Sequence, residues 1–185
     1  MPDMKRVGVL LVALAMTGCS GGGSTPPEAS TTASSATPSV SKSVSPSEDP
    51  LYLEAVAVYR SFWAAERAVL LAGGASELPK EMYNLVIDPA RTLVAKSYAD
   101  LAETGVREAA EPTSILRLAP NEGVSRDGSV ASMKVCEDSR AVPMLYEGKE
   151  LSKGDLVNRV VYFKRVGSRL VISSIAGEVG ERCEL

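Results

Sequence analysis

The chain has 185 residues, a formal net charge of −3 and no histidine. Histidine is the commonest general base and the commonest metal ligand, and no phosphate-binding glycine loop or nucleophile motif occurs, so we expect no metal or cofactor and assign no catalytic residue. No basic run with interleaved aromatic residues occurs, which argues against nucleic acid as a partner.

Residues 1–18 have the pattern of an export signal. A positively charged start precedes an apolar run at 7–16, which is too short to cross a bilayer because a spanning helix needs about 20 residues. The end of this segment, Met16-Thr17-Gly18-Cys19, resembles the lipobox of bacterial lipoproteins, which is an aliphatic residue, two small residues and a cysteine, with Met16 in place of the usual leucine. The resemblance implies that Cys19 becomes the acylated first residue of a protein anchored on the outer face of the cytoplasmic membrane. The alternative is an ordinary secretory signal that contains a cysteine.

Residues 19–50 have the composition of a tether. Of the 31 residues from 20 to 50, 19 are Ser, Thr or Pro, and none is aromatic. Such a segment cannot bury enough apolar surface to offset its chain entropy, so we expect it to be disordered. Its root-mean-square reach would be about 30 Å, and its Ser/Thr content leaves O-glycosylation open.

Residues 51–185 have the length and composition of one globular domain with its own core. Cys136 and Cys183 remain once Cys19 is acylated, and in an oxidising compartment such a pair is expected to form a disulfide. A zinc site is a weak alternative without histidine. A reactive thiol is another, and the two acidic residues that follow the first cysteine argue against it.

A long helix is predicted from Tyr52 to Ala72. Asp49 and Pro50 precede it as a start signal, and two glycines follow it as a stop signal. Its apolar residues form one broad face at 100° per residue, and Glu66 is the one acidic residue within that face. Glu66 is interpreted either as a carboxylate that faces a cavity with a raised pKa or as a side chain at the edge of the core that pairs with an arginine or reaches water.

Two shorter helices are expected next. Residues 77–86 carry apolar side chains at helical spacing. The second helix has its body at 90–103. It should have Asp88 as its N-cap, because the carboxylate accepts from free N–H groups, and Pro89 as its first residue, because proline has no N–H to leave unpaired. Gly105 should end it.

Strands are expected after Pro112. Asp127-Gly128 and Gly167-Ser168 are turn signals between alternating segments. Helices followed by strands predict an α+β fold, an antiparallel sheet with helices on one side. The predicted strands are 114–118, 130–137, 142–146, 156–166 and 169–175.

The order of these elements resembles a known family. Tyr-Arg-Ser-Phe-Trp at 59–63, Asp-Pro-Ala-Arg at 88–91 and Val-Cys-Glu-Asp-Ser at 135–139 are similar to motifs of cell-surface lipoproteins of high-GC Gram-positive bacteria and their phages. The resemblance implies a nuclear-transport-factor-2-like, or SnoaL-like, cystatin-like cone in which a curved sheet wraps the long helix around a pocket. The polar and aromatic residues expected near that pocket are Tyr59, Trp63, Glu66, Tyr98 and Tyr162.

Three functions are compatible with this sequence. The first is a non-enzymatic binding module that is anchored to the membrane through Cys19 and holds an envelope protein, a peptide or a small apolar ligand. The second is a prophage-type lipoprotein that excludes superinfecting phage. The third is a small-molecule isomerase or cyclase of the SnoaL-like kind. The sequence is also compatible with a homodimer.

Overall fold

The computed structural model describes residues 48–185. The predicted export signal, Cys19 and most of the predicted tether, up to residue 47, lie outside the described residues. Two α-helices, one 3₁₀ turn and seven strands follow in this order: α1 (Pro50–Ala72), η2 (Lys80–Met82), α2 (Ala90–Thr104), β1 (Val106–Glu108), β2 (Ile115–Pro120), β3 (Ala131–Asp138), β4 (Pro143–Tyr146), β5 (Lys149–Lys153), β6 (Leu156–Val166) and β7 (Arg169–Val179).

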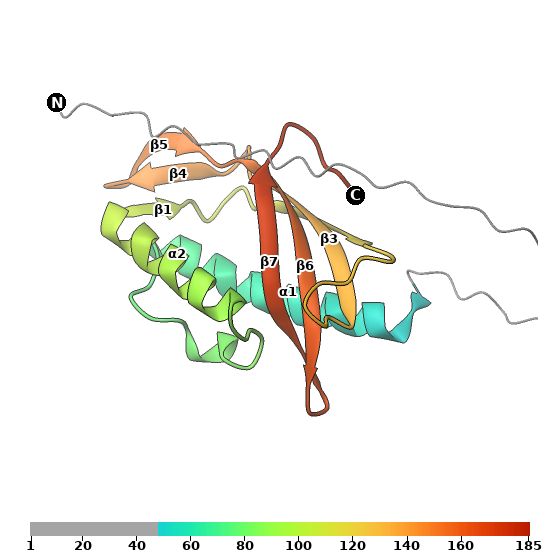
Figure 1. Ribbon diagram of the computed structural model, residues 1–185. Coiled ribbons are helices and arrows are strands. Elements are labelled where there is room, and N and C mark those ends of the chain that lie inside the picture. The colour runs from blue at the N-terminus through green and yellow to red at the C-terminus, as the bar shows by residue number, and fades with distance from the viewer. Residues whose placement is uncertain (1–47) are drawn as a thin grey trace, which may run out of the picture. The chain divides into compact units, whose positions relative to one another are not determined.

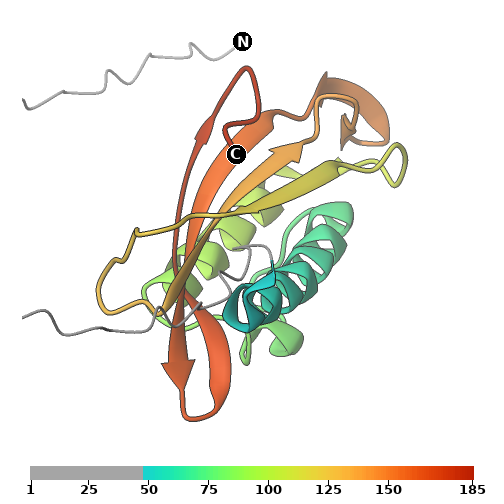
Figure 2. The same ribbon diagram turned by 90° about the vertical axis from the view of Figure 1, so that its right-hand side faces the viewer.

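The strands form two antiparallel sheets, which confirms the predicted α+β class. The larger sheet has the order β2-β3-β6-β7 and the smaller has the order β1-β4-β5. The strands of the larger sheet cross α1, and both helices lie on the same side of that sheet (Figures 1 and 2). One face of the sheet is therefore covered by helices, and the other, which we call the outer face, is not.

Helix α1 forms the centre of the core. The Asp49 carboxylate accepts a hydrogen bond from the Leu51 N–H at 2.8 Å, and Gly73 ends the helix in the left-handed conformation, so both predicted end signals are confirmed. Tyr59 and Phe62 are fully buried at the middle of the helix. They pack among apolar side chains from both helices and from the sheet, including Met82, Val86, Val94, Met133, Val135, Val161, Phe163 and Ile172.

Helix α2 begins one residue later than expected. Its N-cap is Pro89, and the helix itself starts at Ala90. Asp88 is therefore not the N-cap, although its carboxylate still accepts from the Thr92 hydroxyl at 2.7 Å and from the Thr92 N–H at 3.3 Å. The side chain stabilises the first turn from outside the helix. Gly105 ends α2, as predicted.

The helix expected at 77–86 is wrong except for the single turn η2. Val86 instead forms a parallel bridge to Ile172 of β7. Leu85 O accepts from the Ile172 N–H at 2.8 Å, and Ile87 N–H donates to Ile172 O at 2.9 Å. A helix of ten residues is marginal by itself, so pairing with the sheet edge prevails while the apolar side chains stay buried.

The five predicted strands exist, with ends that differ by a few residues. The longest, 156–166, matches β6, whereas β7 runs four residues beyond its predicted end. The predicted turn at 127–128 lies in the loop between β2 and β3, and the turn at 167–168 joins β6 to β7. Strands β1 and β5 were not predicted. They are short, mostly polar and pair only through β4.

The last residues fold back and are fixed to the outer face of the sheet. The predicted disulfide between Cys136 of β3 and Cys183 is present. Asn158 of β6 donates to Arg182 O at 2.8 Å and accepts from the Glu184 N–H at 3.0 Å, so it binds the chain on both sides of Cys183. The disulfide and these two hydrogen bonds hold the end of the chain against the sheet.

Candidate functional site

A buried ionic cluster lies between α1 and the inner face of the larger sheet. Arg159 of β6 donates to Glu66 Oε2 at 3.0 Å and to the Tyr59 hydroxyl at 3.3 Å, and it approaches Glu137 Oε2 of β3 at 3.4 Å. Trp63 donates its indole N–H to Glu137 Oε1 at 2.9 Å. One guanidinium thus joins two carboxylates and two aromatic side chains, and we call these five residues the Arg159 cluster.

Local geometry explains how the sequence assembles this cluster. Tyr59, Trp63 and Glu66 lie at helical spacings of four and three, so they share one face of α1. Arg159 pairs in register with Val135, which places it diagonally opposite Glu137 on the inner face. The helix therefore supplies one carboxylate and two aromatic side chains, and the sheet supplies the cation and the second carboxylate.

Gly177 of β7 makes room for the arginine. It lies opposite Arg159 in the β6–β7 register. A Cβ atom at this position would lie 2.9 Å from Arg159 Cγ, a separation that real side chains do not show. The absence of a side chain at Gly177 thus leaves the space that the Arg159 side chain occupies.

The electrostatics of the cluster are those of two carboxylates that share one cation. Burial raises the pKa of Glu66 above its ordinary value; Arg159 opposes this rise and Glu137 adds to it. Burial also raises the pKa of Tyr59. Since the guanidinium of Arg159 contacts one oxygen of each carboxylate, the charges of the cluster neutralise one another.

Tyr98 of α2 is buried near the same charges. Its pKa is raised by burial first and by the Glu66 carboxylate second. Its hydroxyl has no hydrogen-bond partner among residues 48–185. A buried hydroxyl of this kind is commonly satisfied by an ordered water molecule.

A second buried ion pair extends the polar region along α1. Arg67 contacts Glu108 of β1 at 2.8 Å and donates to Ala110 O at 3.3 Å. Burial raises the pKa of Glu108, and Arg67 opposes that rise. Ser114 and Ser139 lie 2.8 Å apart beside this pair. The second half of α1 is therefore held to both sheets by buried ion pairs.

Four of the five residues expected at a pocket come together here, and Tyr162 does not. Val161 and Phe163 face the core, so Tyr162 lies on the outer face, where the Arg126 guanidinium is 5.9 Å from its ring centroid. Sequence reasoning missed Arg159 and Glu137. Their signal was present, since each is a charged residue in register with the inward-facing apolar residues of its strand.

The chemistry available to the Arg159 cluster is limited by its own contacts. Glu66 is the residue placed as a general base would be, but it is bound by Arg159, and its side chain is 11% exposed. Within residues 48–185 no group of three or more Cys, Asp or Glu side chains is arranged to hold a metal ion. The contacts are those of a structural element that joins α1 to the sheet.

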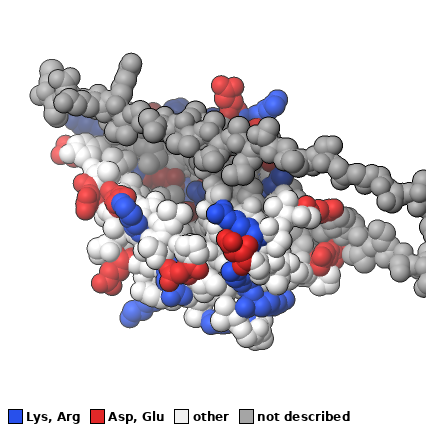
Figure 3. Space-filling view, in the orientation of Figure 1, with Lys and Arg blue, Asp and Glu red and all other residues white. Residues whose placement is uncertain are grey.

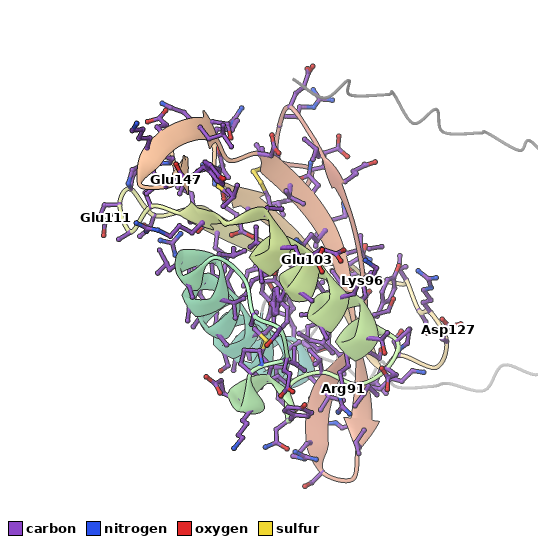
Figure 4. All side chains as sticks on the ribbon, turned by 90° about the vertical axis from the view of Figure 1, so that its left-hand side faces the viewer. Arg91, Lys96, Glu103, Glu111, Asp127 and Glu147 are labelled. Atoms are coloured by element: carbon purple, nitrogen blue, oxygen red, sulfur yellow. A yellow bond between two sulfur atoms is a disulfide. The ribbon has the colours of Figure 1, made fainter. Side chains whose placement is uncertain are left out.

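A separate groove opens on the surface of the domain. It has a volume of about 700 Å³ and lies between the first turn of α1 and the loop that joins β2 to β3. Asp127 marks the outer end of that loop (Figure 4). The volume is within the range of ligand sites. The lining residues are 49–52, 120–125 and 129–132.

The charged side chains elsewhere do not form a second candidate on the face seen in Figure 3. Acidic and basic groups are interspersed there over α2 and β7, without a large field of one sign. Lys96 and Asp100 of α2, for example, form an exposed pair at 2.6 Å. Such surface pairs contribute little to stability or recognition by themselves.

Comparison with known protein families, with curated proteins and with solved structures finds no match for this chain. In the part of the chain that the structure describes, neither helix is sufficiently long and apolar to span a membrane.

Proposed function

We propose that this protein is a lipoprotein anchored by acylated Cys19 on the outer face of the cytoplasmic membrane, and that its domain is a non-enzymatic binding module. The lipobox-like sequence before Cys19 and the Ser/Thr/Pro-rich residues 20–50 support the anchor and the tether. A long helix crossed by a four-stranded antiparallel sheet is compatible with a nuclear-transport-factor-2-like cone, which we propose as the fold.

The groove between α1 and the β2–β3 loop is the observation that carries the binding role. It exposes aliphatic side chains, with Val124 at 45% and Val130 at 48%, around a volume that a small ligand or a peptide segment could occupy. The alternative site, the Arg159 cluster, is filled by its own ion pairs. Binding in the groove is thus better supported than acid–base chemistry at Glu66.

Crosslinking in living cells tests the binding role. A photoreactive amino acid at Val130 should give a defined adduct, and Val124→Trp should suppress it because the indole fills the groove. Leu151→Trp is the matched control, since Leu151 is 64% exposed on β5 and does not line the groove. Absence of an adduct, or equal adducts in both tryptophan variants, would contradict a ligand site here.

The anchor is tested separately by Cys19→Ser. We expect the variant to lose labelling with radioactive palmitate and to leave the membrane fraction, because acyl chains supply the attachment. A variant that remains membrane-bound would defeat the lipoprotein proposal whatever the groove binds.

A further inference from the structure

The charges that line the groove have one sign. Asp49 and Glu122 contribute carboxylates, and among residues 48–185 no lysine or arginine lines the groove. One oxygen of Asp49 accepts from the Leu51 N–H, which leaves the second oxygen for a ligand. An anionic ligand would meet two like charges here, whereas a cationic group would be attracted.

Aliphatic side chains supply most of the remaining surface. Leu51 of α1 and Val124 and Val130 of the loop all line the groove. Exposed aliphatic residues that are gathered in one concave place favour a ligand with aliphatic groups of its own.

Two of the three serine hydroxyls that line the groove already donate within the loop. The Ser132 hydroxyl lies 2.8 Å from Asn121 O and 2.7 Å from Val124 O, and the Ser125 hydroxyl lies 3.2 Å from Ser129 O. The third, that of Ser129, accepts from the Arg126 N–H at 2.9 Å. These contacts hold the loop in shape and leave few hydroxyl hydrogens for a polyhydroxylated ligand such as a sugar.

Asn121 presents the one side-chain amide in the groove. Residues 48–185 contain three asparagines, of which Asn84 accepts from Arg169 at 2.7 Å and Asn158 binds the C-terminal residues. The Asn121 side chain has no hydrogen bond to another described residue. A primary amide offers both a donor and an acceptor, which is the complement of a peptide group.

We propose that the groove binds an extended peptide segment of a partner protein that carries aliphatic side chains and at least one lysine or arginine. Asn121 pairs with a peptide group, Leu51, Val124 and Val130 contact the aliphatic side chains, and the carboxylate of Glu122 attracts the cation. This assignment rests on the proposed binding role and gives that role a ligand class.

The test uses residues 20–185, which retain every described contact. Three probes are compared by fluorescence anisotropy and competition at low salt: a capped hexapeptide of alternating valine and lysine, the same peptide with glutamate in place of lysine, and dodecylamine as a cationic alkyl chain. We expect the glutamate peptide to bind at least about tenfold more weakly than the lysine peptide. Asn121→Ala should weaken the lysine peptide by about three- to tenfold, and Glu122→Gln by about threefold.

Glu147→Gln is the matched control. Glu147 is exposed in the turn between β4 and β5, at the other end of the domain from Asp127 (Figure 4). Its removal changes the net charge as Glu122→Gln does but should leave peptide affinity unchanged. Thermal unfolding of each variant confirms that it is folded.

Equal affinity for the lysine and glutamate peptides, or unchanged affinity in Asn121→Ala, would overturn the peptide assignment. If dodecylamine binds, Val124→Trp blocks it and the lysine peptide does not compete, the groove is a ligand site but not a peptide site. The proposed function would then stand without this inference. If no probe binds and the crosslinking at Val130 also fails, both the peptide assignment and the proposed binding role are wrong.

Discussion

Replacing Arg159 by methionine tests what joins α1 to the sheet. Among the described residues, this guanidinium is the cation that contacts Glu66, at 3.0 Å, and Glu137, at 3.4 Å. Methionine has a comparable length and no charge. The variant therefore leaves two buried carboxylates without a cation while the site stays filled.

The expected loss follows from that burial. Removing one partner of a buried ion pair costs about 3–5 kcal/mol because the remaining charge is uncompensated. The Arg159 side chain retains 19% exposure, which lets some water reach the site, so we expect the lower end, about 3 kcal/mol. For a domain of this size that lowers the melting temperature by about 10 °C.

Urea unfolding followed by tryptophan fluorescence measures this loss. Trp63 is the single tryptophan of the chain, and its indole binds Glu137, so it reports from the cluster itself. Arg165→Met is the matched control. It breaks an arginine–glutamate contact with Glu54 in which both side chains are more than a third exposed, and should cost at most about 1 kcal/mol.

A loss in Arg159→Met no larger than in Arg165→Met would refute the reasoning. It would mean that the carboxylates are solvated or protonated in the folded protein at little cost. Adding Glu66→Gln to Arg159→Met should recover part of the stability. Failure of that rescue would indicate that packing, and not charge, explains the loss.

Three further outcomes are expected. Because burial raises the pKa of Glu66, its ionisation in the folded state lowers the stability of the wild type as the pH rises from the ordinary pKa of 4.5 through the raised one. The free energy of unfolding of Glu66→Gln in urea should therefore increase relative to that of the wild type as the pH rises through this range, and a relative decrease would contradict this. Gly177→Ala should destabilise by about 1–3 kcal/mol, because its Cβ would lie 2.9 Å from Arg159 Cγ; unchanged Trp63 fluorescence and stability would show that the backbone absorbs the contact. Cys183→Ser should lower stability by about 4 kcal/mol on the chain-entropy estimate, and a melting temperature equal to that of the oxidised wild type would count against a stabilising disulfide.

Elements with local signals could be predicted from the sequence. Helix α1 has a capping aspartate at one end and glycine at the other, with one apolar face between them. Strand β6 is rich in valine and aromatic residues and has a glycine turn after it. The order of helices followed by strands then gives the α+β class without knowledge of any contact between distant residues.

Elements that depend on distant partners could not be predicted from the sequence. Residues 77–86 have helical spacing, but Val86 and Ile87 lie alongside β7 because Ile172 offers backbone groups to pair with. Strands β1 and β5 have almost no apolar pattern and exist because β4 lies between them.

The same distinction applies to the Arg159 cluster. Helical spacing places Tyr59, Trp63 and Glu66 on one face of α1. The part of the cluster that α1 contributes can therefore be predicted from the sequence. The partners of Glu66 depend on strand register, which brings Arg159 and Glu137 next to each other from positions 22 residues apart in the chain. The groove depends on the shape of a ten-residue loop, for which the sequence provides turn signals but no conformation.

The position of the groove has a mechanical consequence. Asp49 to Tyr52 form one of its walls and are also the first residues of the folded part of the chain. Under the proposed anchoring, this wall is also the point at which the tether joins the folded domain. A pull on this wall would reach the tether through the first turn of α1, whereas a pull on the β2–β3 loop would pass through the sheet.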